Sequence, residues 1–289
     1  GATSFDQDLS TWDISSLETV TEIFKDSGLS RENWEYTLDS WIDQSNALLR
    51  DLSNVNNLPD AVQQLAPNGY SYTPAPSFDP WNYELFNKIQ AYNSETDVSI
   101  NRWLVHRLTT MSSLFVGISF NDDISRWNVH NVTSMTVMFY QAASFNQDIS
   151  TWNVHNVTDM NGMFQDATGF NKPLNSWNVH NVRSMLAMFY NAKAFDQPLN
   201  SWNVHNVTDM KQMFQDASGF NQDISGWNVN RVQDMSGMFN GATLFNQDLS
   251  TWDISSLEIV THIFKDSGLS RVNWEYTLDS WIDQSNALL

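Results

Sequence analysis

The sequence predicts an α/β solenoid, a fold in which short repeated coils stack along one axis. Three observations predict it. Residues 131–230 consist of four segments of 25 residues that align without gaps. Tryptophan and phenylalanine recur at the same place in each segment, and all 11 methionines fall in two further columns. Apolar residues repeated at such a period are typical of units that share their core with their neighbours.

The aromatic columns mark about seven coils. Each column steps by 25 residues, except that the first tryptophan step is one residue shorter. We expect these side chains to lie between successive layers, because one coil has too few apolar residues to close a core alone. The columns are Trp103, Trp127, Trp152, Trp177, Trp202, Trp227 and Trp252, and Phe120, Phe145, Phe170, Phe195, Phe220 and Phe245.

Each coil is expected to contain a short strand followed by a helical turn. Ile149, Trp152 and Val154 lie in a glycine-free stretch that suits a strand. The apolar residues between 160 and 167 have the spacing of a single helical turn. Strands of successive coils would pair in parallel, about 4.8 Å apart.

The first 49 residues nearly repeat the last 49. Residues 1–49 and 241–289 are offset by 240 positions and differ at five of them. We therefore expect 1–49 to be the last coil and C-terminal cap of a preceding module, folded like 241–289, with its coil face exposed unless another copy covers it. The differing pairs are Ser4/Leu244, Asp6/Asn246, Thr19/Ile259, Glu22/His262 and Glu32/Val272.

Both copies are expected to end in a capping helix. Ser30 in the first copy and Ser270 in the second are candidate helix N-caps. The helix would cover the open end of the stack with one apolar face, as terminal units of a solenoid must. In the first copy this face consists of Trp34, Leu38, Trp41 and Ile42.

The remaining boundaries follow from composition. Residues 50–78 contain four of the seven prolines and are predicted to be a linker. Residues 79–100 are predicted to form an N-terminal helical cap, with Asp79 at the N-cap and Pro80 at the first helical position. The repeat solenoid is expected over 101–264 and the C-terminal helical cap over 265–289.

Composition excludes several classes of partner. With 14 Lys and Arg against 33 Asp and Glu, the chain would repel nucleic acid. It has no apolar run near the length of about 20 residues that a membrane span needs, so we expect no membrane insertion. There is no cysteine, hence no disulfide and no thiolate site. The sequence opens on Gly1 rather than Met, and we expect it to be a processed or excerpted piece.

Several phrases of the repeat carry a resemblance. HNVTDM at 155–160, FNQDIS at 145–150 and the terminal GLSRVNWEYTLDSW at 268–281 are similar to the BspA-type leucine-rich-repeat surface proteins, whose repeat has been described as a domain of unknown function in mycoplasma lipoproteins. The resemblance covers 98–289 and 1–49. It implies a right-handed, leucine-rich-repeat-like solenoid that is secreted or on a cell surface, with a role in adhesion and none in catalysis. The family usually has Ser or Asn at the histidine positions of this chain.

Five of the six histidines form one column, which starts at His106. Imidazoles stacked at coil spacing could bind a transition metal or respond to pH. The alternative is a solvated turn position copied with the repeat, which we favour. The weak metal candidates are His130, His155, His180 and His205.

Three asparagines begin the glycosylation motif N-V-T at the same place in their coils: Asn131, Asn156 and Asn206. Sugars on one edge would suit a surface protein. Alternatively, Asn and Thr cap the following turn or form an asparagine ladder. Asn181 stands in the same column without the Thr, which favours the alternative.

We expect neither an enzyme nor a cofactor, because an active site needs a constellation that occurs once, whereas polar residues here recur in every coil. The favoured hypothesis is an extracellular structural or adhesive protein whose 240-residue modules associate head to tail with other copies into a fibre. The predicted contact between copies involves Phe5, Trp12 and Phe24.

The alternative hypothesis is a monomeric binding module that recognises a glycan or a cell-surface protein on one face of the solenoid. A single column of variable residues would line that face. Its members are Tyr140, Gln165, Tyr190, Gln215 and Asn240.

Overall fold

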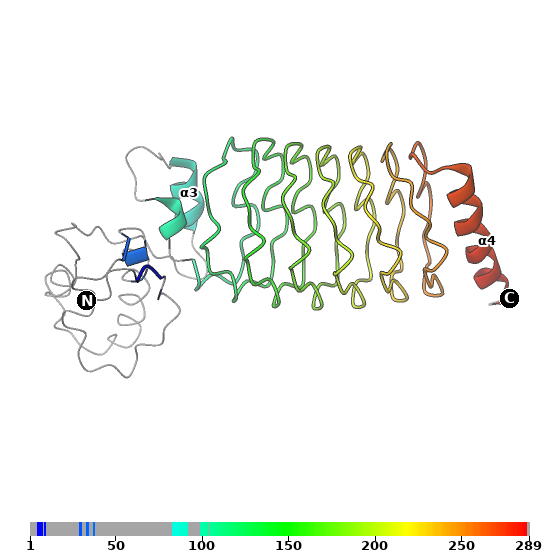
Figure 1. Cartoon of the computed structure of the whole chain (residues 1–289), viewed down its shortest axis with the longest axis horizontal. Coiled ribbons are helices and arrows are strands. Elements are labelled where there is room, and N and C mark those ends of the chain that lie inside the picture. Colours follow the sequence, from blue (N-terminus) through cyan, green and yellow to red (C-terminus); the bar gives the residue numbers. More distant parts are fainter. Residues whose placement is uncertain are drawn as a thin grey trace, which may run out of the picture. The chain divides into compact units, whose positions relative to one another are not determined.

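The computed structural model describes residues 5–7, 9, 29–30, 33–34, 37, 83–91, 99–103 and 105–287. The chain forms two compact units, Gly1–Ser77 with Ser94–Leu104 and Phe78–Asn93 with Val105–Leu289. The second unit is a row of stacked coils with α3 (Tyr83–Ala91) at its start and α4 (Arg271–Ala287) at its finish (Figure 1). The first unit contains the short helix η3 (Ile100–Arg102).

Successive coils are joined by a ladder of single parallel bridges. Each bridge pairs a residue with the one at the same place in the next coil. The first step, from residue 110 to residue 134, is one residue shorter than the others, as the sequence predicted. The ladder consists of Thr110, Ser134, Asp159, Ser184, Asp209, Asp234 and Ile259.

The backbone after each bridge alternates between two kinds of hydrogen bond. The N–H of Val137 donates to the oxygen of Asn161 in the next coil at 2.7 Å, whereas the N–H of Tyr140 donates back to Val137 at 3.2 Å. This path requires left-handed residues twice in a coil, here Val137 with φ 48° and Gln141 with φ 58°. The coil therefore advances by tight turns that each direct one N–H group to the neighbouring coil.

The pairing lies in a different part of the coil from the one predicted. The sequence favoured a strand around Ile149 and Trp152 and a helical turn at 160–167, but the bridge is at Asp159 and 160–167 holds the tight turns. Among the described residues the bridges stay isolated and no extended strand forms. The left-handed residues explain both differences, because a positive φ interrupts an α-helix and an extended strand alike.

The apolar columns lie between the coils, as predicted. Trp152 is 3% exposed, Phe145 is fully buried, and so are the methionines of both columns. The ring of Phe139 stacks on Phe145 of its own coil at 3.9 Å and on Phe164 of the next at 5.5 Å. The indole Nε1 of Trp152 donates to the oxygen of Ile124 on the preceding coil at 3.1 Å, and Trp177, Trp202, Trp227 and Trp252 make the same bond.

The two ends of the stack carry helices where caps were predicted. In α3, Leu85 and Ile89 are buried; the predicted cap residues Asp79 and Pro80 lie outside the described residues. At α4, the hydroxyl of Ser270 accepts the N–H of Asn273 at 3.3 Å, which is the bond expected of a helix N-cap.

One row of α4 residues attaches the helix to the last coil. The N–H of Leu249 donates to Thr277 Oγ1 at 3.1 Å, and Trp281 Nε1 donates to the oxygen of Leu249 at 3.3 Å. Further along, Gln284 Nε2 donates to the oxygen of Trp252 at 2.9 Å. These side chains recur at helical spacing, so they form one continuous face of contact.

The apolar face predicted for the capping helix is only partly used in α4. Trp281 is 5% exposed, but Trp274 and Ile282 are 47% and 52% exposed. A helix turns about 100° per residue, so Trp274, Leu278 and Ile282 form a flank beside the attached row rather than part of it. The sequence pattern could not separate this flank from the face that contacts the coil.

Candidate functional surfaces

One edge of the stack carries the histidine column. His155 and His180 are exposed, and the other three members are half-buried. At four of the five histidines the backbone N–H donates to the Oδ1 atom of the asparagine two residues earlier, as where His155 donates to Asn153 at 3.3 Å. Burial, and then the charge of His106, lower the pKa of His130.

The histidine side chains do not converge on one point. In the part of the chain that the structure describes, no three His, Cys, Asp or Glu residues group so that they could hold a metal ion. The Nδ1 atoms of His180 and His205 lie 3.3 and 3.4 Å from the amide nitrogens of Asn203 and Asn228 on the following coil. The metal candidates His130, His155, His180 and His205 therefore form a line of separate side chains.

Beside the histidines runs an asparagine ladder. Asn131, Asn156 and Asn206 donate through Nδ2, the atom to which a sugar would be joined, to the oxygen of a histidine on the preceding coil at 2.8, 2.7 and 2.8 Å. Asn181 lacks the glycosylation motif and makes the same bond at 2.7 Å. Thr158 donates its Oγ1 to the preceding coil at 3.2 Å. Contacts between coils thus account for both polar residues of the motif.

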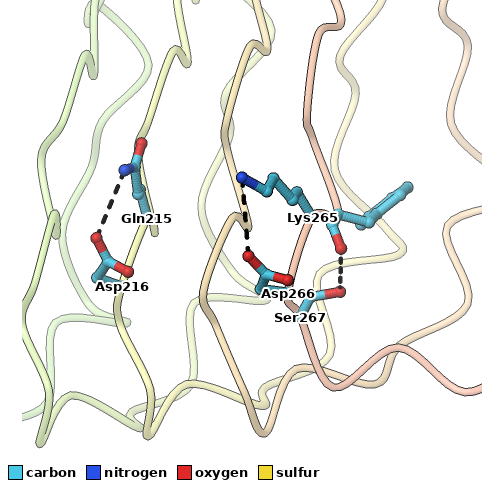
Figure 2. A network of polar contacts seen from close by, with 6 residues as sticks. Gln215, Asp216, Lys265, Asp266 and Ser267 are labelled. Carbon is cyan, nitrogen blue, oxygen red and sulfur yellow. Dashed lines mark hydrogen bonds and ion pairs between the residues drawn. The ribbon is translucent and has the colours of Figure 1, made fainter.

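Another column was predicted to bind ligands, and its members Tyr140, Gln165, Tyr190, Gln215 and Asn240 are all half-buried. Residues with left-handed backbone follow it in sequence, for example Asp216 with φ 56°. Gln215 Nε2 donates to Asp216 Oδ2 at 3.5 Å, and two coils further on Lys265 lies 4.0 Å from Asp266 (Figure 2). Burial, and then the carboxylate of Asp216, raise the pKa of Tyr190.

The C-terminal end of the stack is only partly covered. At each of the six earlier junctions, four N–H groups of one coil donate to oxygen atoms of the next. In the last coil the equivalent N–H groups have no hydrogen-bond acceptor among the described residues. They belong to Val260, His262, Phe264 and Asp266.

Exposed apolar side chains accompany these unpaired N–H groups. Val260 is 42% exposed, whereas Met235, at the same place in the preceding coil, is 1% exposed. The ring of Phe264 lies 5.9 Å from that of Trp281 in α4, so the edge and the helix adjoin. We call residues 259–266, together with the flank Trp274, Leu278 and Ile282 of α4, the open end.

The first copy of the repeated segment reproduces the cap that ends the stack. The N–H of Leu9 donates to Thr37 Oγ1 at 3.1 Å, as that of Leu249 does to Thr277 Oγ1. Three further side-chain bonds of the first copy recur in the second. The two caps therefore have the same local structure in the residues described.

The predicted contact between copies can be located only at Phe5. This side chain is half-buried, and the neighbouring residues 6 and 7 are exposed. Its counterpart in the second copy, Phe245, is fully buried. The other two predicted residues, Trp12 and Phe24, lie outside the described residues.

Sequence reasoning did not single out the open end, although the sequence held a signal for it. At three of the five positions where the copies differ, a polar residue in the first is replaced by an apolar residue in the second. All three replacements are exposed: Leu244 at 60%, Ile259 at 46% and Val272 at 57%. One of them, Ile259, belongs to the open end, so a comparison of the two copies position by position would have pointed to it.

The sequence matches a family model described as Mycoplasma protein of unknown function, DUF285, over residues 1–60, 83–197 and 173–277. Comparison with curated proteins and with solved structures gave no significant match. Within the described ranges, no helix combines the length and the apolar character needed to cross a lipid bilayer.

Proposed function

The chain belongs to the DUF285 family, and we propose that it is a non-enzymatic structural protein whose 240-residue modules join head to tail into a fibre. Each module would consist of a stack of coils and its caps. The fibre would act outside the cell, in adhesion or as a scaffold, through the repeated edges of the stack.

The open end is the observation that carries this proposal. A row of backbone N–H groups on an exposed edge can donate hydrogen bonds to the carbonyl oxygens of another backbone. The residues that flank it, among them Val260 and Trp274, expose apolar surface that a neighbour would bury. Contacts between unlike surfaces do not close on themselves unless the rotation completes a ring, so they produce open filaments.

The half-buried Phe5 supports a second contact, between the first copy of the repeated segment and a coil that precedes it in the fibre. Its counterpart Phe245 stacks on Phe220 of the preceding coil at 6.1 Å. In a fibre, a coil of the preceding module would provide the same ring for Phe5, and Trp12 and Phe24 would extend this contact.

The proposed place of action comes from the resemblance of the repeat to BspA-type leucine-rich-repeat surface proteins. A stack with an acidic surface and polar edges suits exposure to solvent. Outside the cell the N-V-T motif would be exposed to glycosylating enzymes. The Nδ2 atoms of Asn131, Asn156 and Asn206, to which a sugar would be joined, donate hydrogen bonds to the preceding coil.

Electron microscopy of chains with one, two and three consecutive modules tests the fibre. We expect a continuous rod whose length grows in proportion to the number of modules. Separate particles joined by variable gaps would contradict the proposal. Antibodies that label intact cells of the source organism would test the location independently.

A second candidate function is a monomeric module that binds a glycan or a protein. The half-buried column that contains Tyr140, Tyr190 and Gln215 favours it, because hydroxyl and amide groups alternate there beside carboxylates. Loss of glycan binding in a Tyr190→Ala variant, with single short rods in the microscope, would favour this function over the fibre.

A further inference from the structure

We propose that the open end donates backbone hydrogen bonds to the first coil of a second copy of this chain, in the register that joins successive coils within the stack. The part of the first coil that makes this contact, residues 109–117, is fully described and lies in the same compact unit as the open end. The inference rests on the proposed function, head-to-tail association, and deepens it by naming the two surfaces that meet.

The hydrogen bonds between coils have a fixed direction. At each junction four N–H groups of the earlier coil donate to oxygen atoms of the later coil, as where Phe115 donates to Met138 at 2.9 Å. One further bond runs in the opposite sense, as where the N–H of Thr133 donates to the oxygen of Thr109 at 2.8 Å. A stack built in this way has two chemically different ends.

The first coil presents the acceptors that the open end requires. Among the described residues its four ladder oxygens have no donor, and the N–H of Thr109 has no acceptor. At the C-terminal end of the stack the pattern is reversed, since four N–H groups and the oxygen of Glu258 have no partner in the described part of the chain. In the register of the inner junctions, five donors therefore meet five acceptors. The pairs are Val260 with Thr110, His262 with Ser112, Phe264 with Leu114, Asp266 with Val116, and Thr109 with Glu258.

The backbone conformation of the open end favours a coil of the same repeat as its partner. The open end contains two left-handed residues, His262 with φ 58° and Asp266 with φ 55°. The first coil has left-handed residues at the matching places, Ser113 with φ 65° and Gly117 with φ 68°. An extended strand lacks such residues and advances about 3.3 Å per residue, so its oxygen atoms lose register with N–H groups on a chain of tight turns.

Two open ends cannot pair with each other in this way. Both would contribute N–H groups, because the oxygens of alternate residues from Ile259 to Lys265 already accept hydrogen bonds from the preceding coil. Two first coils have the opposite shortage, since both would contribute oxygens. The ladder therefore joins unlike ends, and contacts between unlike ends repeat along a filament unless the rotation completes a ring.

Both edges are accessible to a second copy. Within the described residues, the hydrogen bonds from α4 to the last coil fall on residues 246–254 and leave the backbone of the open end unbonded. The open end also exposes apolar surface, such as Val260 at 42%, that docking would bury. On the first coil Ser112 and Val116 are half-buried and Gly117 is exposed.

Disulfide cross-linking between copies tests the contact. The protein has no cysteine, so Ile259→Cys and Thr110→Cys each introduce one thiol, at the two positions that would form the next bridge of the ladder. Residues paired across neighbouring strands lie about 4.8 Å apart, within the Cα separation of about 4.4–6.8 Å that a disulfide spans. The matched control combines Ile259→Cys with Ser201→Cys, an exposed position away from both ends.

We expect the mixed disulfide between positions 259 and 110 to form at least about tenfold faster than the control disulfide, because docking raises the effective concentration of one thiol near the other. Adding Val260→Lys should remove this advantage, since a charged side chain on an edge opposes pairing. Equal rates in the two mixtures would overturn the inference. So would a faster disulfide between two Ile259→Cys chains, because it would place two open ends in contact.

Hydrogen exchange of the natural chain tests the same contact without substitutions. Exchange in the peptide 258–266 and in a peptide containing Thr109 should slow together as the protein concentration rises, because the contact bonds N–H groups on both sides. Slowing in 258–266 alone would give the open end a different partner and overturn the inference. Unchanged exchange in both peptides would overturn it as well.

Two outcomes separate this inference from the proposed function. Preferential cross-linking between 259 and 110 without continuous rods in the microscope would overturn the fibre and support the docking of the two ends. Rods without preferential cross-linking would support the fibre and overturn the docking through these ladder residues.

Discussion

The two copies of the 49-residue segment are covered on opposite sides. In the first copy the cap tryptophan Trp34 is buried and the coil phenylalanine Phe5 is half-buried. In the second copy Phe245 is buried and Trp274 is exposed. In the residues described, near-identical sequences thus share their local hydrogen bonds and differ in the burial of equivalent side chains. Such a segment can connect two parts of the protein, since each of its two sides can contact a different part.

The largest expected effect is at the coil side of this segment. Phe245 stacks on Phe239 at 3.9 Å and is fully buried, so Phe245→Ala should lower the free energy of unfolding by about 3–5 kcal/mol. The matched Phe5→Ala change should cost less than half of this. Urea denaturation, combined with hydrogen exchange of peptides from each copy, measures both. Equal losses would show that the coil sides of the two copies are equally covered.

The cap side should give the reverse order. Trp34→Ala removes a fully buried side chain and should cost about 3 kcal/mol, whereas Trp274→Ala should cost about 1 kcal/mol, because half of that side chain is already in water. The measurement is the same urea series. If Trp274→Ala proved as costly as Trp34→Ala, the open end would already be covered in the free chain.

The sequence predicted the parts of this molecule that depend on composition and period. Trp152, Phe145 and the methionine columns are buried because a regular period forces like residues onto one another. The place of the bridges was predicted wrongly. Ala187 and Gln212 adopt a left-handed backbone conformation, which is uncommon for residues other than glycine, so their identity gave no sign of it. The asparagine column was ambiguous, because Asn156 has the same motif whether it bears a sugar or bonds to the next coil.

The difference between Trp34 and Trp274 could not be predicted at all. Both lie in the sequence NWEYTLDSW, so every local rule treats them alike. The adjacent difference between Glu32 and Val272 does not predict which of the two tryptophans is buried. The exposed replacements Leu244, Ile259 and Val272 were the one visible clue.

A smaller effect is expected when the second copy is given the residues of the first. The triple change Leu244→Ser, Ile259→Thr and Val272→Glu alters only exposed side chains, so each should change the free energy of unfolding by less than about 0.5 kcal/mol. The same change should weaken association between modules, measured by sedimentation of the two-module chain. A large loss of stability would instead place these side chains in contacts within the free chain.

The smallest effect concerns the polar residue beneath each cap. Asp6 Oδ1 accepts the N–H of Ser30 at 2.7 Å, and Asn246 Oδ1 accepts that of Ser270 at 2.8 Å. Since a carboxylate forms stronger bonds than an amide and favours a helix N-terminus, Asn246→Asp should stabilise by about 0.5 kcal/mol and Asp6→Asn should destabilise by a similar amount. Thermal unfolding in low salt measures both changes, and about 1 M salt should remove most of each by screening. Changes of the same sign would mean that the two caps, despite their shared bonds, are not electrostatically equivalent.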